Sequence, residues 1–164
     1  EELMKYIKID SYGKCLHNKD IDEDLLQMRN KYAQKSAILS RYKFALAFEN
    51  SNEPDYVSEK IYNALADGVV PIYWGAPNIA EYAPTGSYIN VDDFESAEQL
   101  AKHIQYLIDN PSEYDKYLDW KRKSPEKHML ELYPKSNVFY LCRMCQYAHE
   151  RRKERLSPSQ HNEL

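Results

Sequence analysis

A short polar stretch in the first half of the chain contains residues suited to binding a phosphorylated ligand rich in hydroxyls. Lys60 follows Glu59 early in a helix expected to begin near Tyr56, and Asn50 lies at the end of an apolar run. A helix start offers free backbone N–H groups and a positive dipole end, so the Lys60 ammonium there could neutralise a diphosphate. Glu59 can accept hydrogen bonds from ribose or sugar hydroxyls, and Asn50 can both donate and accept.

The alternative interpretation is that these residues are structural. Glu59 and Lys60 have favourable helix propensity and suit an exposed helix surface, and Asn50 suits a turn. Spacing alone favours this alternative, because no glycine-rich phosphate loop accompanies the residues. Neither GxGxxG nor GxxxxGK[ST] occurs in the chain, which argues against a Rossmann dinucleotide site and against a P-loop ATPase.

The pattern of apolar residues around this stretch predicts a βαβ unit. Residues 44–48 form an apolar run typical of a buried strand, residues 57–65 carry apolar side chains at helical spacing until Gly68, and residues 69–74 form a second apolar run. Such a unit has parallel strands and a right-handed crossover. Because ligands of open α/β sheets bind beyond the carboxyl ends of the strands, we expect the chemistry in the loop of residues 49–60.

The rest of the chain continues an α/β pattern. Further strands are predicted at residues 6–9 and 87–91, and further helices at residues 31–39, at 76–82, from Ser96, from Ser112 and at 136–152. Ser96 is expected to cap its helix. The apolar face of that helix comprises Ala97, Leu100, Ala101, Ile104, Leu107 and Ile108. Strands and helices alternate about four times, which predicts a Rossmann-like parallel sheet with helices on both faces, and a disordered tail at residues 157–164.

Composition places the chain among ordinary globular domains. Its 164 residues suffice for one domain, and 43% are hydrophobic and 29% charged. The net charge of -4 gives no broad attraction to nucleic acid, and no apolar run is long enough to span a bilayer. Because the sequence begins at Glu1 without a methionine, we expect residues 1–156 to be an amino-terminally truncated domain of a longer protein.

Metal binding receives little support from the sequence. Asp92 and Asp93 invite comparison with the Asp-x-Asp metal clamp of many sugar-nucleotide enzymes. Adjacent acids after a strand point in different directions, however, so a turn-capping role is favoured. The five histidines are scattered without metal spacing.

The cysteines favour structural disulfides. Cys142 and Cys145 form a lone CxxC, and His149 is the only close candidate for a further zinc ligand, whereas zinc needs two more. Together with Cys15 the number of cysteines is odd, so at least one lacks an internal partner. We expect disulfides to cysteines elsewhere in a longer protein.

One segment resembles the donor-binding motif of the α1,3/α1,4-fucosyltransferase family: it reads FENSNEPDYVSEKIYNALADGVVPIYWGAP. The family pattern is close to FENS, a short variable loop, DY-[IV]-[ST]-EK, a helix, V-P-[IV] and G-x-P. Residues 87–94, SYINVDDF, are similar to a second family stretch, and residues 10–18, DSYGKCLHN, are similar to the eukaryotic branch. The resemblance covers residues 6–145, so it is more specific than a single motif.

The resemblance implies a two-lobed GT-B glycosyltransferase, with this chain as its carboxyl-terminal lobe, which binds GDP-fucose. By motif position, Asn50, Tyr56, Glu59 and Lys60 would contact GDP-fucose, with Lys60 at the diphosphate and Glu59 near the ribose. In this family a carboxylate base deprotonates an acceptor hydroxyl, which attacks the fucose anomeric carbon with inversion as GDP leaves. No metal is obligatory in the family, and a divalent cation would act only as a stimulant.

The family resemblance also implies parts that this chain does not contain. The catalytic base and the acceptor pocket belong to the amino-terminal lobe, and a phosphate-binding arginine precedes the DSYG segment. Arg29 and Arg41 lie in the wrong place to replace that arginine. We therefore assign no catalytic base and expect the chain alone to be inactive.

The function expected from the resemblance is inverting, α1,3-type transfer of fucose to an acceptor glycan or glycoprotein. Eukaryotic members of the family are Golgi membrane proteins with a lumenal catalytic domain, so a membrane anchor is expected only in the full-length protein. One alternative is a catalytically silent nucleotide-sugar-binding or interaction module of the same fold, and another is a glycosyltransferase using a different nucleotide sugar. The intact motif from Tyr56 to Lys60 favours the enzyme.

Overall fold

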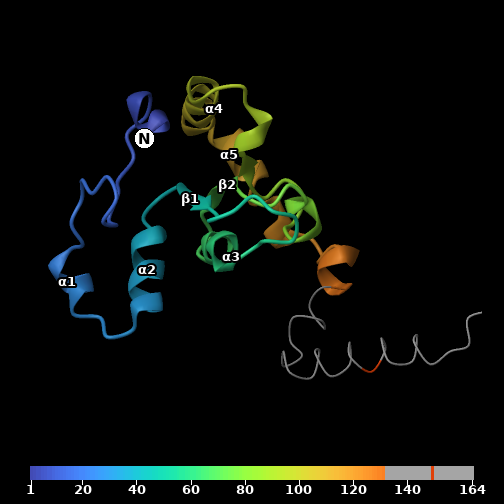
Figure 1. The fold of residues 1–164 in the computed structure, drawn as a ribbon, viewed down its shortest axis with the longest axis horizontal. Helices are drawn as coiled ribbons and strands as arrows, with labels where there is room; N and C mark the ends of the chain where they lie inside the picture. The colour runs from blue at the N-terminus through green and yellow to red at the C-terminus, as the bar shows by residue number, and fades with distance from the viewer. Residues whose placement is uncertain (132–148, 150–164) are drawn as a thin grey trace, which may run out of the picture. The chain divides into compact units, whose positions relative to one another are not determined.

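The computed structural model describes residues 1–131 and 149, in two compact units, Glu1–Pro125 and Glu126–Leu164. The helices and strands of the first unit are drawn in Figure 1; in chain order they are α1 (Glu23–Leu26), α2 (Lys31–Leu39), β1 (Phe44–Phe48), α3 (Glu59–Ala66), β2 (Val70–Trp74), β3 (Ile89–Asn90), α4 (Ala97–Asp109) and α5 (Pro111–Lys116). Short 3-10 helices cover Glu2–Lys5, Ile79–Glu81, Val91–Asp93 and Asp119–Arg122. In the second unit residues 127–131 are helical. The predicted helix at 136–152, the predicted disordered tail, Cys142 and Cys145 lie outside the described residues.

The first unit is built on a parallel sheet, which within residues 1–131 has three strands in the order β1-β2-β3. Phe44 of β1 pairs with Val70 of β2, and Ile72 of β2 pairs with Ile89 of β3. Helix α3 connects β1 to β2 and packs against both strands, as Figure 1 shows. The βαβ unit predicted from the apolar pattern is therefore confirmed.

Helices cover both faces of this sheet. Successive residues of a strand point to opposite faces, so each strand supplies side chains to both helical layers. On one face, Ile72 packs in a cluster with Ile104 of α4. On the other face, Ala47 and Tyr73 pack in a cluster with Ile61 of α3. The predicted architecture of a parallel sheet between two helical layers is confirmed.

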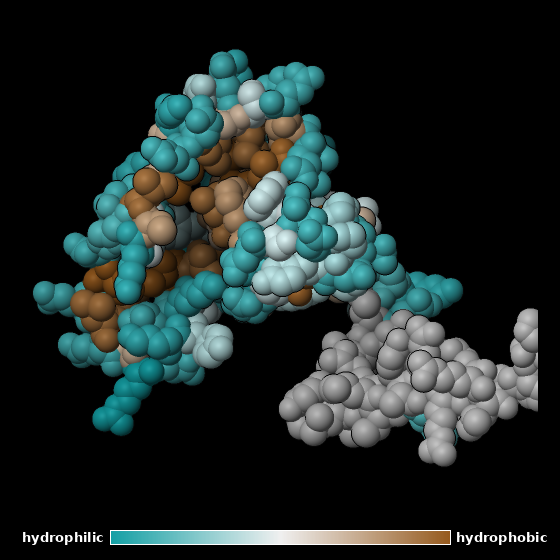
Figure 2. All heavy atoms as spheres, viewed as in Figure 1, coloured by the Kyte–Doolittle hydropathy of each residue, from teal (hydrophilic) through white to brown (hydrophobic). Residues whose placement is uncertain are grey.

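Strand β1 lies at an edge of the described sheet, and part of its apolar surface is exposed. Leu46 and Phe48 are both exposed. The Phe48 ring lies edge-on to Trp74, with 6.5 Å between the ring centroids. Figure 2 shows apolar side chains lining a hollow on the face seen there. The sheet therefore presents apolar side chains at the surface along β1 as well as in its core.

No helix within the described part of the chain is both long enough and apolar enough to cross a membrane.

The strand predicted at residues 6–9 is wrong. The chain there pairs with no strand among the described residues: the Tyr6 and Ile7 N–H groups donate back to the Leu3 carbonyl, and an asparagine side chain takes the carbonyl of Ile9. The Ile9 carbonyl accepts from the Asn18 side-chain amide at 2.8 Å, and the Asn18 carbonyl oxygen accepts from the Ser11 N–H at 2.7 Å. The neighbouring Asp10 carboxylate accepts from the Tyr42 hydroxyl at 2.7 Å, which ties this segment to the residues before β1.

Other predicted elements differ in their bounds. The strand predicted at 87–91 is only Ile89–Asn90, because the Asn90 side chain accepts from the Asp92 N–H and starts a 3-10 helix. The helix predicted at 76–82 is reduced to the 3-10 turn Ile79–Glu81. Helix α5 begins at Pro111, one position before Ser112, since proline is well suited to the first turn of a helix.

Helix α4 confirms the predicted cap and most of the predicted apolar face. The Ser96 hydroxyl accepts from the Gln99 N–H at 3.2 Å. Ile104 is 2% exposed and lies in the core, whereas Ile108 is 37% exposed. The assignment of Ile108 to the buried face is therefore wrong. The residue continues the apolar spacing into the last turn of α4, but it is not among the buried residues of that helix.

We predict that Ile104→Ala and Ile108→Ala differ sharply in stability, although both remove the same atoms from the same helix. Ile104→Ala should lower the free energy of unfolding by about 2–5 kcal/mol, because it leaves a cavity between α4 and the sheet. Ile108→Ala should cost less than about 1 kcal/mol. Urea unfolding followed by circular dichroism measures both, and equal losses would contradict the packing of α4 described above.

Candidate functional site

The predicted site loop begins where β1 ends and leads directly into α3. Glu49 follows the last residue of β1, and its N–H donates to the Trp74 carbonyl at the end of β2, at 2.8 Å. The carboxyl ends of the two neighbouring strands are thereby joined by a hydrogen bond beyond the ladder. The polar loop that follows emerges at this edge of the sheet, the position at which α/β domains bind ligands.

The central feature of the site is the buried carboxylate of Glu49. Its side chain is 0% exposed. One carboxylate oxygen accepts from the Ser58 N–H at 2.8 Å, and the other accepts from the Ser58 hydroxyl at 2.6 Å and from the Lys60 ammonium at 2.7 Å. Lys60 also donates to the Ser58 hydroxyl oxygen at 2.8 Å. A buried charge is tolerated because an opposite charge and two further donors satisfy it.

Both members of this pair are charged at neutral pH. Burial alone would raise the pKa of Glu49, but the hydrogen bonds from Lys60 and Ser58 outweigh burial and leave the pKa below its ordinary value of 4.5. The hydrogen bond to Glu49 in turn raises the pKa of Lys60 above its ordinary value of 10.5. The Lys60 side chain is 26% exposed, so part of it lies at the surface, whereas that of Glu49 does not.

Ser58 precedes α3 at the position of an N-cap, but its side chain does not cap the helix. A serine at this position ordinarily accepts a hydrogen bond from an N–H of the first turn. Here its hydroxyl donates to Glu49 and accepts from Lys60 instead. The N–H groups of the first turn of α3 are therefore left without a side-chain cap, which suits an anionic ligand.

The predicted start of α3 near Tyr56 is wrong, because the helix begins at Glu59. Ser58 has an extended backbone, with φ -108° and ψ -170°, and its N–H donates to Glu49, so the helical conformation starts only after it. Lys60 consequently occupies the second position of α3. It lies closer to the positive end of the helix than the apolar spacing indicates.

The middle of the loop is anchored by Asp55, which has a left-handed backbone conformation with φ 66°. Its N–H donates to the Asn78 side chain at 2.9 Å, and its carboxylate accepts from the Asn78 amide and the Tyr82 hydroxyl, each at 2.7 Å. The Tyr82 hydroxyl, with help from Asn78, lowers the pKa of Asp55, and this hydrogen bond together with burial raises the pKa of Tyr82 to about 12. The loop is thus held against the chain that follows β2.

The structure places the four predicted donor-binding residues along this one loop and helix start. Asn50 is the second residue of the loop, Tyr56 lies farther along it, Glu59 is the first residue of α3, and all three are exposed. Only Lys60 is drawn into the network with Glu49. Among the hydrogen bonds and ion pairs of residues 1–131, none joins the side chain of Asn50, Tyr56 or Glu59 to another residue. These side chains are available to a ligand.

Sequence reasoning missed Glu49 and the residues that accommodate it. A signal was present, since an acidic residue directly after a buried strand must find a partner. In the sequence, Gly75 follows the apolar run of residues 69–74 and matches the G-x-P part of the family pattern, which gives no link to Glu49. A Cβ atom at Gly75 would lie 2.6 Å from Cγ of Glu49 and 2.5 Å from the Tyr73 hydroxyl, so only glycine leaves room for both.

The other candidate groups in the sequence do not gather into a site. Asp92 and Asp93 are exposed in the 3-10 helix after β3, and the Asp92 N–H is capped by Asn90 at 3.3 Å. Within the residues that the structure describes, no group of His, Cys, Asp and Glu is arranged to hold a metal ion. Cys15 is exposed and free.

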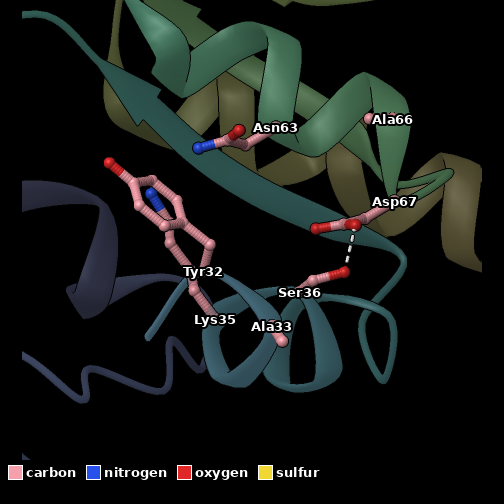
Figure 3. Close-up of a pocket in the computed structure, with 7 residues that line it drawn as sticks. All are labelled: Tyr32, Ala33, Lys35, Ser36, Asn63, Ala66 and Asp67. Atoms are coloured by element: carbon pink, nitrogen blue, oxygen red, sulfur yellow. Dashed lines mark hydrogen bonds between the residues drawn. The ribbon is translucent and has the colours of Figure 1, made fainter. Parts of the chain in front are cut away.

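A cavity of about 270 Å³ lies between α2 and α3, but at the end of α3 remote from Lys60. Figure 3 shows the side chains that line it: Tyr32, Ala33, Lys35, Ser36, Asn63, Ala66 and Asp67. The Ser36 hydroxyl donates to Asp67 at 2.5 Å, which joins the two helices. The cavity is part of the helix packing and is separate from the loop site.

The fold and the loop together define a class of protein. A parallel sheet between helical layers, with a lysine at an uncapped helix start beyond a strand, is typical of nucleotide-binding α/β domains. Residues 1–162 match the family model described as "Glycosyltransferase family 10 (fucosyltransferase) C-term". The chain therefore belongs to the glycosyltransferase family 10 fucosyltransferases, and it matches their C-terminal part.

Individual relatives agree with this assignment. The chain is 45% identical over 127 residues to GDP-fucose protein O-fucosyltransferase 3 of Gallus gallus, covering 74% of this chain and 26% of the relative. It is 47% identical over 126 residues to the Danio rerio protein of the same name, covering 74% and 27%. Among solved structures, an α1,3-fucosyltransferase with GDP-fucose superposes with a TM-score of 0.62 at 28% identity, covering 77% of this chain and 35% of that one. The fold is thus that of a GT-B fucosyltransferase lobe, and the chain spans about a quarter of the length of these curated relatives.

We predict that Gly75→Ala destabilises the first unit by about 1–3 kcal/mol, because the new methyl group must displace Glu49 or Tyr73 from the packed edge of the sheet. Gly13→Ala is the matched control, since a Cβ there meets nothing within 4 Å. Its effect should stay within about 0.5 kcal/mol. Urea unfolding of both variants checks this, and a Gly75→Ala protein as stable as the control would show that Glu49 is less tightly enclosed than described.

Proposed function

We propose that this chain is the GDP-fucose-binding lobe of an inverting fucosyltransferase. One observation carries the proposal: the Lys60 ammonium is held at the uncapped start of α3, beyond the carboxyl end of β1, in the segment that matches the family's donor motif. A diphosphate placed there meets an ammonium group and free backbone N–H groups together. The match to family 10 and the similar structure solved with GDP-fucose support the choice of donor.

The remaining loop residues are given roles by their positions. Lys60 and the first-turn N–H groups of α3 would bind the diphosphate, and Glu59, exposed one residue earlier, would accept hydrogen bonds from the ribose. Asn50 and Tyr56 would contact the donor from the start and the end of the loop. Anchoring of the loop by Asp55 keeps these positions fixed before the ligand arrives.

In the proposed reaction a carboxylate base outside this chain removes the proton of the acceptor hydroxyl. The hydroxyl oxygen then attacks the anomeric carbon of fucose, the bond from that carbon to the diphosphate breaks, and GDP departs. Negative charge develops on the diphosphate as this bond breaks, and Lys60 with the N–H groups of α3 stabilises it. We propose that this positive charge makes a metal dispensable, so that a divalent cation can stimulate but is not required.

The names of the relatives point to two classes of acceptor. The curated relatives at 45% and 47% identity are named protein O-fucosyltransferases, which favours a protein hydroxyl. The structural relative at 28% identity is named an α1,3-fucosyltransferase, which favours the glycan hydroxyl expected from the family resemblance. We give the protein hydroxyl first place because its relatives are the more similar. Either acceptor agrees with a lumenal Golgi location, which we propose for the whole protein.

The donor assignment predicts that the chain binds GDP in preference to UDP and that Lys60→Ala weakens GDP binding at least about tenfold. Loss of a charge-assisted phosphate contact costs about 1.5–3 kcal/mol. Isothermal titration calorimetry measures both, with Lys102→Ala as the control, because Lys102 also pairs with a glutamate at 2.7 Å but on the surface of α4. Lys60→Arg, which keeps the charge, should retain more affinity than Lys60→Ala.

Two results would overturn the donor assignment. The first is equal affinity of the folded chain for GDP and UDP, or no affinity for either. The second is an equal response to Lys60→Ala and Lys102→Ala. Thermal unfolding curves establish that each variant is folded, which is needed because Lys60→Ala leaves the buried Glu49 carboxylate without its cation.

The acceptor class can be read from the linkage in the product. The natural protein that contains this chain is incubated with GDP-fucose and either a folded glycoprotein or the glycans released from it. Fucose on a serine or threonine oxygen should be released by alkaline β-elimination, whereas fucose on a glycan hydroxyl should stay with the glycan. Labelling of released glycans alone would overturn the protein acceptor in favour of α1,3-type transfer.

A further inference from the structure

We infer that Glu49 is a positioning residue for the donor diphosphate, acting through Lys60 and Ser58. The inference rests on the proposed function, since it says how the diphosphate site is prepared. Glu49 itself is fully enclosed and cannot touch a ligand, because its side chain is 0% exposed. Its contribution must pass through the two residues that it binds.

The carboxylate of Glu49 is itself fixed by its surroundings. Its backbone N–H is bound to the Trp74 carbonyl at 2.8 Å, so the residue is joined to the end of β2. The absence of a side chain at Gly75 provides the space that Cγ of Glu49 fills. The Ser58 N–H holds one carboxylate oxygen at 2.8 Å and leaves the other to face Lys60. An immobile carboxylate is therefore presented to a long, flexible lysine.

Fixing Lys60 before the ligand arrives has a direct energetic consequence. A free lysine side chain loses considerable rotamer freedom when it binds a phosphate, and this loss reduces affinity. In this structure the ammonium is already held at 2.7 Å from Glu49 and 2.8 Å from the Ser58 hydroxyl. An ammonium group has three N–H donors, and Glu49 and Ser58 take two of them. The third has only to be directed to the ligand.

Glu49 also determines what Ser58 does. Its carboxylate oxygen accepts a hydrogen bond from the Ser58 hydroxyl oxygen at 2.6 Å. This bond holds the Ser58 side chain away from the first turn of α3, which it would otherwise cap. Without the carboxylate, the hydroxyl would be free to take a first-turn N–H in the manner of an ordinary N-cap. The same buried group thus orients the ammonium and keeps the N–H groups open. Both effects favour an anion at the same place.

The competing explanation is that the Glu49–Lys60 pair only stabilises the fold. A structural pair would change the free energy of unfolding when broken, but it would not couple the effect of Glu49 on GDP affinity to the presence of Lys60. A double-mutant cycle on GDP affinity separates the two explanations, after the pKa of Lys60 has tested whether Glu49 holds the ammonium at all.

The first measurement is the pKa of Lys60, followed by NMR titration of its side chain in the full chain. Glu49→Gln keeps the size of the side chain and removes its charge, so the pKa of Lys60 should fall toward its ordinary value of 10.5. Glu98→Gln is the matched control, because Glu98 pairs with Lys102 at 2.7 Å on exposed α4. It should leave Lys60 unchanged. An unaltered Lys60 titration in Glu49→Gln would overturn the inference, and this readout needs no ligand.

The second measurement is GDP affinity by calorimetry for the unsubstituted chain, Glu49→Gln, Lys60→Met and the double variant. We expect Glu49→Gln to weaken GDP binding about tenfold when Lys60 is present. Most of this effect should vanish when Lys60 is Met. Glu98→Gln should bind GDP normally.

The outcomes distinguish the two proposals. If the unsubstituted chain does not bind GDP, the proposed function fails. If it binds GDP and Glu49→Gln binds equally well, or loses the same affinity with and without Lys60, the positioning role alone fails. Should Glu49→Gln not fold, Ser58→Ala replaces it, because that variant keeps the buried pair and removes only the bridging hydroxyl. Ser58→Ala should then weaken GDP binding less than tenfold but measurably, and unchanged affinity would overturn the inference.

Discussion

The arrangement of the site depends on one buried ionic interaction at the end of β1. The Glu49 carboxylate has no access to water, so the fold must supply every hydrogen bond that water would otherwise provide. It does so with the Ser58 N–H and hydroxyl and the Lys60 ammonium. This arrangement explains why Ser58 does not cap α3 and why glycine occupies position 75. A neutral residue in place of Glu49 would leave Ser58 and Lys60 free to adopt other arrangements.

The parallel βαβ topology explains why this interaction occurs at a surface where a ligand can bind. A parallel crossover returns the chain to the opposite end of the sheet, so the loop after β1 and the start of α3 lie beyond the carboxyl edge. The loop is attached to Trp74 through the Glu49 N–H and to Asn78 and Tyr82 through Asp55, and Ser58 binds Glu49 within the loop. Between them, Asn50 and Tyr56 remain exposed. A rigid frame with exposed side chains is well suited to nucleotide-sugar recognition, and in the proposed enzyme this division leaves the base and the acceptor to other residues.

Much of the fold could be predicted from periodicity and capping residues. The apolar runs located β1 and β2, and Ser96 located the start of α4, because these signals are local. Prediction failed where distant residues decide. Ile9 and Ile7 suit a strand by composition, but the Asn18 amide takes the Ile9 carbonyl and no strand forms. Ile108 continues the spacing of Ile104 yet remains exposed, since nothing in the described core reaches it.

The sequence by itself determined the residue types of the candidate site, their order, and the family resemblance that names a donor. It placed Lys60 near a helix start, because strand and helix periods can be read along the chain. Only the tertiary structure decided which side chains are free and which are committed. Lys60 is paired with a carboxylate that sequence reasoning passed over, whereas Asn50, Tyr56 and Glu59 stay exposed. The physical reason is that burial and charge pairing depend on what lies nearby in space, and the neighbours of Glu49 come from both strands and from α3.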